Sequence, residues 1–324
     1  MRTGKSIRIF VVCLLMVFLL SGCAVSSGSD RGPYKVWFVA KSTETAFWRS
    51  AFAGANAAKS EYNIELTICG PDSEEDYETQ NRMIDEAVAA GADAILFSAI
   101  SYMENAPAID RAAKAGLRIV VIDSDVASEN VNARIGTNNI AAGEMAAEAA
   151  LASRDGELTV GIVNFDLGSR NGQERETGFR NKMLASGRVA DMVTINVPAT
   201  VESAKKETKE LLADRPDINL LVGLNEPIAV GTAEAVYELG LKDEVALTGF
   251  DTNTRCIDLM REGSVKALVA QNPYAMGYLG IEACRNLLEG EKYNASEWID
   301  TGTTAVTKED MFTPENERAL FAFE

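Results

Sequence analysis

The stretch Leu220–Pro227 reads Leu-Leu-Val-Gly-Leu-Asn-Glu-Pro, a short apolar run that ends in an amide, a carboxylate and a proline. A run of this length is typical of a strand buried on both faces. Asn225, with Pro227 just behind it, is a signal for the start of a helix. The stretch therefore predicts a strand that brings polar side chains to the beginning of a helix.

The same arrangement recurs elsewhere in the chain. Val36–Ala40 precedes Lys41 and Thr45, Ile119–Ile122 precedes Asp123 and Asp125, Leu247–Phe250 precedes Asp251 and Asn253, and Lys266–Ala270 precedes Gln271 and Asn272. In open α/β sheets, ligands bind beyond the carboxyl ends of the strands, where loops and helix starts converge. The sequence therefore predicts a polar binding site built from strand ends.

Strand and helix patterns alternate in two sets of similar length. The first set has strands at 36–40, 64–68, 94–97 and 117–122, and helices at 47–59, 76–90 and up to 115. The second has strands at 159–163, 192–197, 220–224, 245–249 and 266–270, and helices at 171–185, 202–214, 226–239 and 254–262. Near-continuous apolar strands between helices indicate parallel sheets covered on both faces, in two similar domains.

Residues 133–139 interrupt this alternation before an alanine-rich helix that begins near Ala141. We interpret Ile135–Thr137 as a crossing between the two domains. Asn272-Pro273 opens a further long helix to about Glu289, and Trp298–Thr304 is a second candidate crossing.

Composition narrows the classes of function. The 324 residues carry a formal charge of −17 and contain no histidine. The acidic surface argues against nucleic acid as a partner, because neutralising phosphates needs a basic surface. Without histidine the chain lacks the commonest general base and metal ligand, which argues against most hydrolytic and metal chemistry. We expect no metal and no cofactor.

Residues 1–22 have the features of a secretory signal peptide: a basic head, the apolar run Ile9–Leu20 and small residues before Cys23. Leu20-Ser21-Gly22-Cys23 also resembles the lipobox of bacterial lipoproteins, in which the cysteine is lipidated and becomes the new N-terminus. An ordinary signal peptide with an incidental Cys23 is the alternative. Residues 23–33, rich in Ser and Gly, are predicted to be a flexible tether.

The remaining cysteines, Cys69, Cys256 and Cys284, match no metal motif by their spacing. Buried free thiols are the favoured interpretation. A bridge between Cys256 and Cys284 is the alternative.

The chain resembles the type I periplasmic binding proteins, in the sugar-binding branch typified by the ribose-binding protein. The resemblance covers essentially the whole chain after the leader. It is carried by Phe47-Trp48, Val121-Ile122-Asp123, Gly136-Thr137-Asn138-Asn139, Arg175-Glu176-Thr177-Gly178-Phe179, Asn225-Glu226, Gly249-Phe250-Asp251 and Ala270-Gln271.

The resemblance implies an α/β fold of two doubly wound parallel-sheet lobes joined by three crossovers, with a ligand held between them. Residues 34–136 plus 272–302 would form the N-terminal lobe, and residues 137–271 plus 303–324 the C-terminal lobe. It also implies that Asp123, Asn225, Asp251 and Gln271 bond sugar hydroxyls, and that Phe47 and Trp48 stack on the sugar ring. Carboxylates and amides suit hydroxyls, which donate and accept, and an aromatic ring suits the C–H face.

The complete set of ligand-binding candidates comprises these six residues and six others near strand ends or the crossover: Lys41, Thr45, Phe47, Trp48, Asp123, Asp125, Asn138, Asn171, Gln173, Asn225, Asp251 and Gln271. Structural alternatives exist for several of them. Asn225 and Asp251 also suit helix N-caps, and Asp125 also suits a turn. Phe47 and Trp48 could be core residues of the first helix.

Arg175 is interpreted as a structural ion-pair partner, and Asn171 as the better candidate for the cleft. The chain also departs from the ribose binders. Ser124 and Gln173 stand where those proteins carry arginine, and Thr45 where asparagine is common. These differences argue against ribose itself but leave the lobe architecture intact.

The sequence thus predicts an extracytoplasmic, lipid-anchored, monomeric solute-binding protein. It would capture a monosaccharide or polyol and deliver it to an ABC permease, without catalytic residues. The alternative is a sensor that signals to a membrane receptor such as a histidine kinase. A sugar-responsive repressor would need an N-terminal helix-turn-helix where the secretory segment stands, and an enzyme is the least favoured class.

Overall fold

The computed structural model describes residues 32–320 of the chain. The signal peptide, Cys23 and most of the predicted tether lie outside the described residues. The compact unit that begins at Tyr34 carries the fold. No helix among residues 32–320 combines the length and apolarity that a membrane crossing requires.

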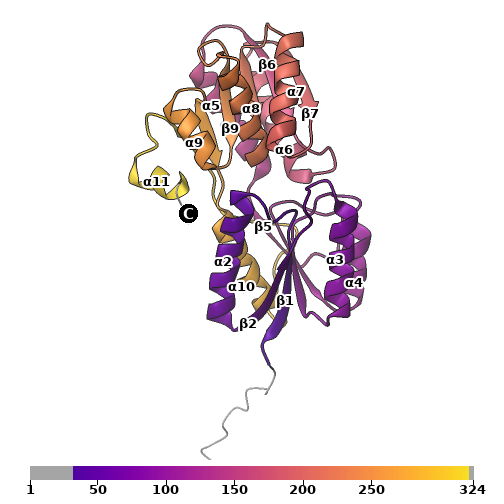
Figure 1. The fold of residues 1–324 in the computed structure, drawn as a ribbon. Helices are drawn as coiled ribbons and strands as arrows, with labels where there is room; N and C mark the ends of the chain where they lie inside the picture. Colours follow the sequence, from indigo (N-terminus) through magenta and orange to yellow (C-terminus); the bar gives the residue numbers. More distant parts are fainter. Residues whose placement is uncertain (1–31, 321–324) are drawn as a thin grey trace, which may run out of the picture. The chain divides into compact units, whose positions relative to one another are not determined.

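The described residues form two six-stranded sheets, and the first has the order β11-β5-β4-β3-β1-β2 with all pairs parallel (Figure 1). Its strands are β1 (Tyr34–Val39), β2 (Ile64–Cys69), β3 (Ala94–Phe97), β4 (Arg118–Ile122), β5 (Ala133–Gly136) and β11 (Trp298–Asp300). Its helices are α2 (Ala46–Tyr62), α3 (Tyr77–Ala89), α4 (Ala106–Lys114) and α10 (Pro273–Leu288). The side chains of α2 and α10 form one apolar cluster with the strands, and those of α3 and α4 form another.

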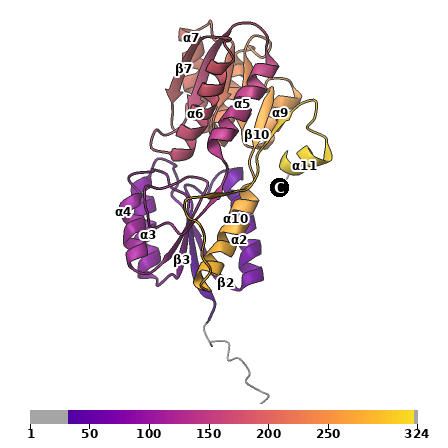
Figure 2. The same cartoon turned by 180° about the vertical axis from the view of Figure 1, so that it is seen from behind.

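The second sheet has the order β12-β10-β9-β8-β6-β7, parallel except for β12. Its strands are β6 (Leu158–Asn164), β7 (Val189–Asn196), β8 (Leu220–Gly223), β9 (Ala246–Phe250), β10 (Ala267–Ala270) and β12 (Thr304–Thr307). Its helices are α5 (Asn139–Ser153), α6 (Arg170–Ala185), α7 (Val201–Asp214), α8 (Glu226–Glu238) and α9 (Thr254–Arg261), followed by α11 (Pro314–Leu320). Figure 2 shows α5 beside α6 from behind.

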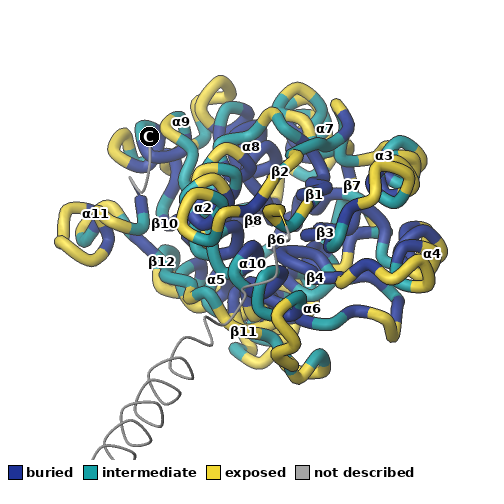
Figure 3. Tube along the Cα trace, turned by 90° about the horizontal axis from the view of Figure 1, so that it is seen from below, coloured by how far each residue is buried: buried dark blue, intermediate teal, exposed yellow. Residues whose placement is uncertain are grey.

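The two sheets repeat one plan, so β4 and β9 occupy the same place in their sheets, as do β3 and β8. The predicted fold, two doubly wound parallel sheets with helices between the strands, is confirmed. Central strands are buried and outer helix turns exposed, as the dark blue and yellow segments of Figure 3 show. Since parallel sheets need cover on both faces, this pattern explains the near-continuous apolar strands.

The interpretation of Ile135–Thr137 as a crossing was wrong for Ile135 and Gly136, because the interruption at residues 133–139 contains a strand. Residues Ala133–Gly136 form β5, which pairs with β4 and β11 in the first sheet. The strand was missed because it is short and contains Arg134, whose Nε donates to Asp125 Oδ1 at 2.8 Å. The crossing to the second sheet follows at Thr137 and Asn138. Similarly, residues 298–304 include β11 of the first sheet, and the chain crosses between Asp300 and Thr304. The third crossing lies between β10 and α10.

We propose that residues 34–136 plus 272–302 form the N-terminal lobe. Residues 137–271 plus 303–324 then form the C-terminal lobe.

Glycines let two pairs of helices approach closely, α2 with α10 and α5 with α6. A Cβ on Gly54 of α2 would collide with the carbonyl oxygen of Tyr274 in α10, and one on Gly277 with that of Ala51. Gly143 of α5 and Gly178 of α6 form the same reciprocal pair in the other lobe. Only glycine permits this backbone contact.

Cys69, Cys256 and Cys284 are free thiols, and Cys256 and Cys284 lie in the apolar clusters of different lobes. The favoured interpretation as free thiols is confirmed, although Cys69 is only partly buried. Burial raises the pKa of the Cys69 thiol to about 12.

Candidate functional site

Two aspartates stand at equivalent strand ends in a strained backbone conformation. Asp123 follows β4 with φ of 58°, and Asp251 follows β9 with φ of 68°. Among the described residues, Asn63 is the one other non-glycine residue with positive φ. Such conformations are uncommon, although aspartate and asparagine tolerate them best, and they concentrate at functional sites. Both side chains are at least nine-tenths buried.

Asp123 is bonded by side chains from both lobes. Ser98 Oγ, from the end of β3, donates to Asp123 Oδ2 at 2.8 Å. Asn171 Nδ2, from the first turn of α6, donates to Asp123 Oδ1 at 2.9 Å. The guanidinium of Arg175 lies one turn further along α6, with Nη2 3.9 Å from the same oxygen. The carboxylate of the N-terminal lobe therefore meets donors of the C-terminal lobe.

Arg175 lies at the centre of the polar cluster, with 1% of its surface exposed. Its nitrogens donate to Asn139 Oδ1 at 2.9 Å, to the Leu224 carbonyl at 2.9 Å and to Gln271 Oε1 at 2.7 Å. Its guanidinium also lies 4.8 Å from the centre of the Phe250 ring. Arg175, interpreted above as a structural ion-pair partner, lines the same cavity as Asp123 and Asn171.

Asp251 accepts one side-chain hydrogen bond, from Gln271 Nε2 at 2.7 Å. Burial raises the pKa of the Asp251 carboxyl to about 6. Arg175 and the Gln271 bond act in the opposite direction, while the neighbouring Glu226 and Asp123 add to the rise. Asp251 is not a helix cap, because Asn253 caps α9 by accepting from the Arg255 amide at 2.8 Å.

The opposite wall is formed by residues that follow β1. Lys41 is buried; its Nζ donates to Ser169 Oγ at 3.0 Å and lies 3.5 Å from Glu74 Oε2. Trp48 Nε1 donates to Glu74 Oε1 at 2.9 Å. The rings of Phe47 and Trp48 meet edge to face, with centres 5.1 Å apart. Both aromatics belong to the apolar cluster of α2 and also line the cavity.

Glu226 connects the lobes in a way the sequence did not indicate. Its Oε2 accepts from the Phe47 amide at 2.8 Å and its Oε1 from the Ala46 amide at 3.2 Å. Asn253 Nδ2 also donates to Oε1, at 2.8 Å. A carboxylate of the C-terminal lobe thereby satisfies free amides at the start of α2, where the helix dipole favours negative charge.

These groups surround one cavity between the lobes, with a volume of about 30 Å³. Nine predicted site residues line it: Lys41, Thr45, Phe47, Trp48, Asp123, Asn171, Asn225, Asp251 and Gln271. Sequence reasoning missed five lining residues: Glu74, Phe165, Arg175, Glu226 and Pro227. Two of the five, Arg175 and Glu226, lie in the fragments Arg175–Phe179 and Asn225-Glu226 that carry the family resemblance, and this was the signal that could have found them.

Two of the nine residues also cap helices. Thr45 Oγ1 accepts from the Trp48 amide at 3.4 Å at the start of α2. Asn225 Oδ1 accepts from the Ile228 amide at 3.1 Å at the start of α8. The predicted helix start at Asn225 is confirmed, and its cap role coexists with a place in the cavity wall.

The other three predicted residues lie outside the lining of this cavity. Asp125 pairs with Arg134, as described above. Asn138 caps α5 by accepting from the Ala141 amide at 3.1 Å and is exposed. Gln173 lies on α6 with a buried Nε2 that has no partner.

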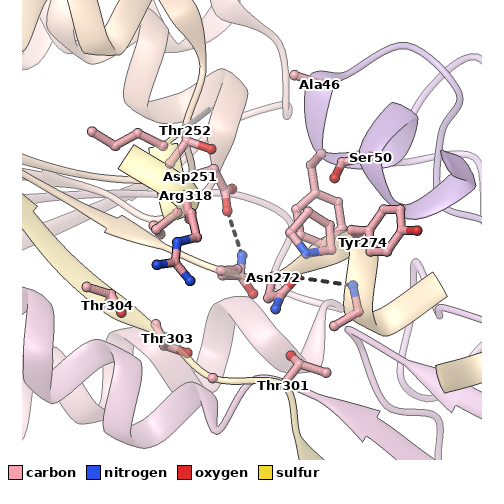
Figure 4. Close-up of a pocket in the computed structure, with 18 of the residues that line it drawn as sticks. Ala46, Ser50, Asp251, Thr252, Asn272, Tyr274, Thr301, Thr303, Thr304 and Arg318 are labelled. Atoms are coloured by element: carbon pink, nitrogen blue, oxygen red, sulfur yellow. Dashed lines mark hydrogen bonds between the residues drawn. The ribbon is translucent and has the colours of Figure 1, made fainter. Parts of the chain in front are cut away.

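A second, larger cavity of about 990 Å³ adjoins the first at the crossovers (Figure 4). We call it the hinge-side cavity and define it by its lining residues: Ala46, Phe47 and Ser50 of α2, Glu226 of α8, Asp251, Thr252, the crossover segments 270–275 and 301–304, and residues 314 and 317–320 of α11. Phe47, Glu226, Asp251 and Gln271 line both cavities. The described residues contain no group of acidic, cysteine or histidine side chains placed to hold a metal ion.

Comparison with known proteins gives consistent matches over most of the chain. A family model described as a periplasmic binding protein domain matches residues 36–292. The ribose import binding protein RbsB of Bacillus subtilis is 26% identical over 293 residues, which cover 87% of this chain and 93% of that protein.

Two solved structures are similar in sequence and fold. A carbohydrate transporter solute-binding protein of Agrobacterium radiobacter in complex with D-arabinose is 26% identical with a TM-score of 0.84, covering 89% of this chain and 99% of the other. An ABC transporter solute-binding protein of Agrobacterium vitis with bound D-fucose is 28% identical with a TM-score of 0.85, covering 89% and 100%.

Proposed function

Since the chain belongs to the periplasmic binding protein family, among the sugar-binding solute-binding proteins of ABC transporters, we propose that it captures a monosaccharide or polyol and delivers it to an ABC importer. The relatives are substrate-binding proteins and not enzymes, and this chain is a binding protein as well. The family places it outside the cytoplasm.

The observation that carries the proposal is the convergence of Asp123 and Asp251 on one cavity from equivalent strands of the two lobes. Carboxylate oxygens accept from sugar hydroxyls, while Asn171, Arg175 and Gln271 beside them supply donors. A hydroxyl both donates and accepts, so this mixture satisfies it. Phe47 and Trp48 add apolar surface for the C–H face of a ring.

The cavity volume indicates that binding requires the lobes to separate. Ligand sites for small molecules usually measure about 300–1,000 Å³, whereas the cavity between Asp123 and Asp251 measures about 30 Å³. Direct bonds such as Asn171–Asp123 and Lys41–Ser169 cross between the lobes at present. A sugar that enters would take over these donors and acceptors, so closing over the ligand recovers bonds that opening breaks.

Isothermal titration calorimetry of the purified protein against D-ribose, D-arabinose, D-fucose, D-galactose and D-mannitol tests the proposal. We expect at least one of them to bind with a dissociation constant in the micromolar range or below, and mass spectrometry to recover it unchanged. Binding of a different class of metabolite with no response to any sugar or polyol would refute the sugar assignment.

We also propose that Cys23 carries the lipid anchor and that the protein is a monomer. Metabolic labelling with a palmitate analogue should label the wild type, whereas Cys23→Ser should lose the label and leave the membrane fraction. A label that persists in Cys23→Ser would exclude this anchor. Light scattering of the soluble variant should give the mass of one chain.

A further inference from the structure

The hinge-side cavity has the size of a ligand site in its own right. Its volume of about 990 Å³ lies at the upper end of the usual range for small-molecule sites. Figure 4 shows Asp251, Asn272, Thr301, Thr303 and Arg318 around the space. The N-terminal lobe contributes Ser50 and Tyr274, and the C-terminal lobe contributes Thr252 and α11.

The hinge-side cavity shares part of its wall with the cavity between the lobes. Asp251, Gln271, Glu226 and Phe47 line both spaces. Among the described residues, the side-chain hydrogen bond to Asp251 comes from Gln271, which also lies at this wall. A sugar hydroxyl bonded to Asp251 would therefore lie at this shared wall, and a substituent on that sugar could extend toward the larger cavity when the lobes separate to admit the ligand.

The walls of the hinge-side cavity suit a second hydroxylated group. Hydroxyls of Ser50, Thr252, Thr303 and Thr304 line it. Thr301 Oγ1 is buried and lacks a hydrogen-bond partner. A buried hydroxyl without a partner is costly, and a ligand hydroxyl or ether oxygen would relieve that cost. Phe47 and Pro273 supply apolar surface among these polar groups.

We propose that the natural ligand is a glycoside, with one sugar ring between Asp123 and Asp251 and its glycosidic substituent, a second sugar or a group of similar size, in the hinge-side cavity. This inference rests on the proposed function and narrows it to substituted sugars. The C-terminal helix α11 then forms part of the binding site, because residues 314 and 317–320 line one side of the cavity.

The test compares each free sugar with its own glycosides on the full-length protein. D-ribose, D-arabinose, D-galactose and D-glucose are titrated by calorimetry beside their methyl and phenyl glycosides, together with lactose and maltose. We expect a phenyl glycoside or a disaccharide to bind at least tenfold more tightly than the parent sugar.

A variant that fills the hinge-side cavity locates the substituent. Thr303→Phe should reduce the affinity for the preferred glycoside at least tenfold and change that for the parent sugar less than twofold. Thr67→Phe is the matched control, because Thr67 is exposed on the edge strand β2 and far from the crossovers in sequence. It should change neither affinity.

Each other outcome overturns the inference in a distinct way. Free sugars that bind at least tenfold more tightly than all their glycosides refute the glycoside but leave the proposed function standing. Failure of every sugar and glycoside refutes both. If glycosides bind only after truncation behind Leu320, the hinge-side cavity does not accept a substituent in the full-length protein and the inference fails.

Discussion

At the scale of single residues, the backbone of Asp251 decides which substitution can test its role. A left-handed conformation costs most residues with a Cβ about 1–2 kcal/mol, and asparagine is among the few that accept it readily. Asp251→Ala would therefore change folding and binding together. Asp251→Asn keeps the shape and backbone preference, removes the charge and exchanges one acceptor oxygen for an amide donor.

We expect Asp251→Asn to weaken sugar binding at pH 7.5 by about 1.5–3 kcal/mol, the range for a hydrogen bond to a charged group. Calorimetry with the best ligand of the panel measures this loss. Asp85→Asn, which affects a surface pair with Arg111, is the control and should bind normally. Wild-type affinity in Asp251→Asn would show that Asp251 contributes no such bond to the ligand.

The raised pKa of Asp251 gives a second prediction. Burial moves this pKa from 3.8 to about 6, so the folded protein keeps the proton over a wider pH range than the unfolded chain does. The contribution of Asp251 to the free energy of unfolding is therefore greatest below about pH 4 and is lost as the pH rises to about 6.

Urea unfolding of wild type and Asp251→Asn between about pH 4 and pH 7 measures this loss. The stability of the wild type relative to the variant should fall by on the order of 2–3 kcal/mol over this range, since each pKa unit corresponds to about 1.4 kcal/mol. The comparison cancels the opposite trend from carboxylates whose pKa is lowered, such as Asp76 and Glu176. If the free energies of unfolding of the two proteins changed equally with pH, the raised pKa of Asp251 would be contradicted.

At the scale of elements, the close contact between α2 and α10 depends on glycine at Gly54 and Gly277. Alanine normally stabilises a helix interior relative to glycine by about 1 kcal/mol. Here we expect Gly54→Ala to lower the free energy of unfolding by about 1–3 kcal/mol, because the new Cβ meets the backbone of Tyr274 and the helices must move apart.

Urea denaturation of Gly54→Ala gives this value. Ser60→Ala, on the exposed side of α2, is the control and should stay within about 0.5 kcal/mol of the wild type. Stabilisation by Gly54→Ala would mean that helix propensity outweighs the contact.

The elements that the sequence predicted share a strong local signal. Strands such as β8 and β10 are uninterrupted apolar runs, and helices such as α8 begin at a capping residue. The missed strand β5 has four residues and a central arginine, so its strand character comes from pairing with β4 and β11 rather than from its own sequence. Such tertiary pairing leaves no local pattern.

The predicted binding site shows the same difference between features with a local sequence pattern and features that arise only from tertiary contacts. Residues directly behind strands, such as Asp123 and Asp251, were found because parallel strands end at one edge of a sheet. Arg175 was missed because it lies inside α6, one turn beyond Asn171, and Glu226 because its partners are the Ala46 and Phe47 amides of the other lobe. The approach of the other lobe cannot be inferred from spacing along the chain.

At the scale of the whole molecule, direct hydrogen bonds between the lobes accompany those in the candidate site. The Tyr102 amide donates to the Gly168 carbonyl at 2.8 Å, and the Ala199 amide donates to Glu75 Oε1 at 2.7 Å. Each bond joins a residue of the N-terminal lobe to a residue of the C-terminal lobe. A ligand therefore does not act alone in closing the lobes, and the protein's own contacts contribute to the closed state.

Glu226 is the contact whose removal tests this shared contribution. Glutamine in its place has one acceptor oxygen instead of two and no charge, so one amide at the start of α2 loses its partner. A hydrogen bond to a charged group contributes about 1.5–3 kcal/mol. We expect Glu226→Gln to weaken ligand binding by about ten- to a hundredfold.

Small-angle X-ray scattering separates loss of closure from loss of a ligand contact. The radius of gyration of unliganded Glu226→Gln should exceed that of the wild type, and saturating sugar should restore it, because the ligand's bonds then hold the lobes together. Glu234→Gln is the matched control on the same helix, since its carboxylate pairs with Lys205 at 3.1 Å near the surface. If Glu226→Gln and Glu234→Gln have the same radius and the same affinity, the bonds to Ala46 and Phe47 do not contribute to closure, and the ligand alone must supply its free energy.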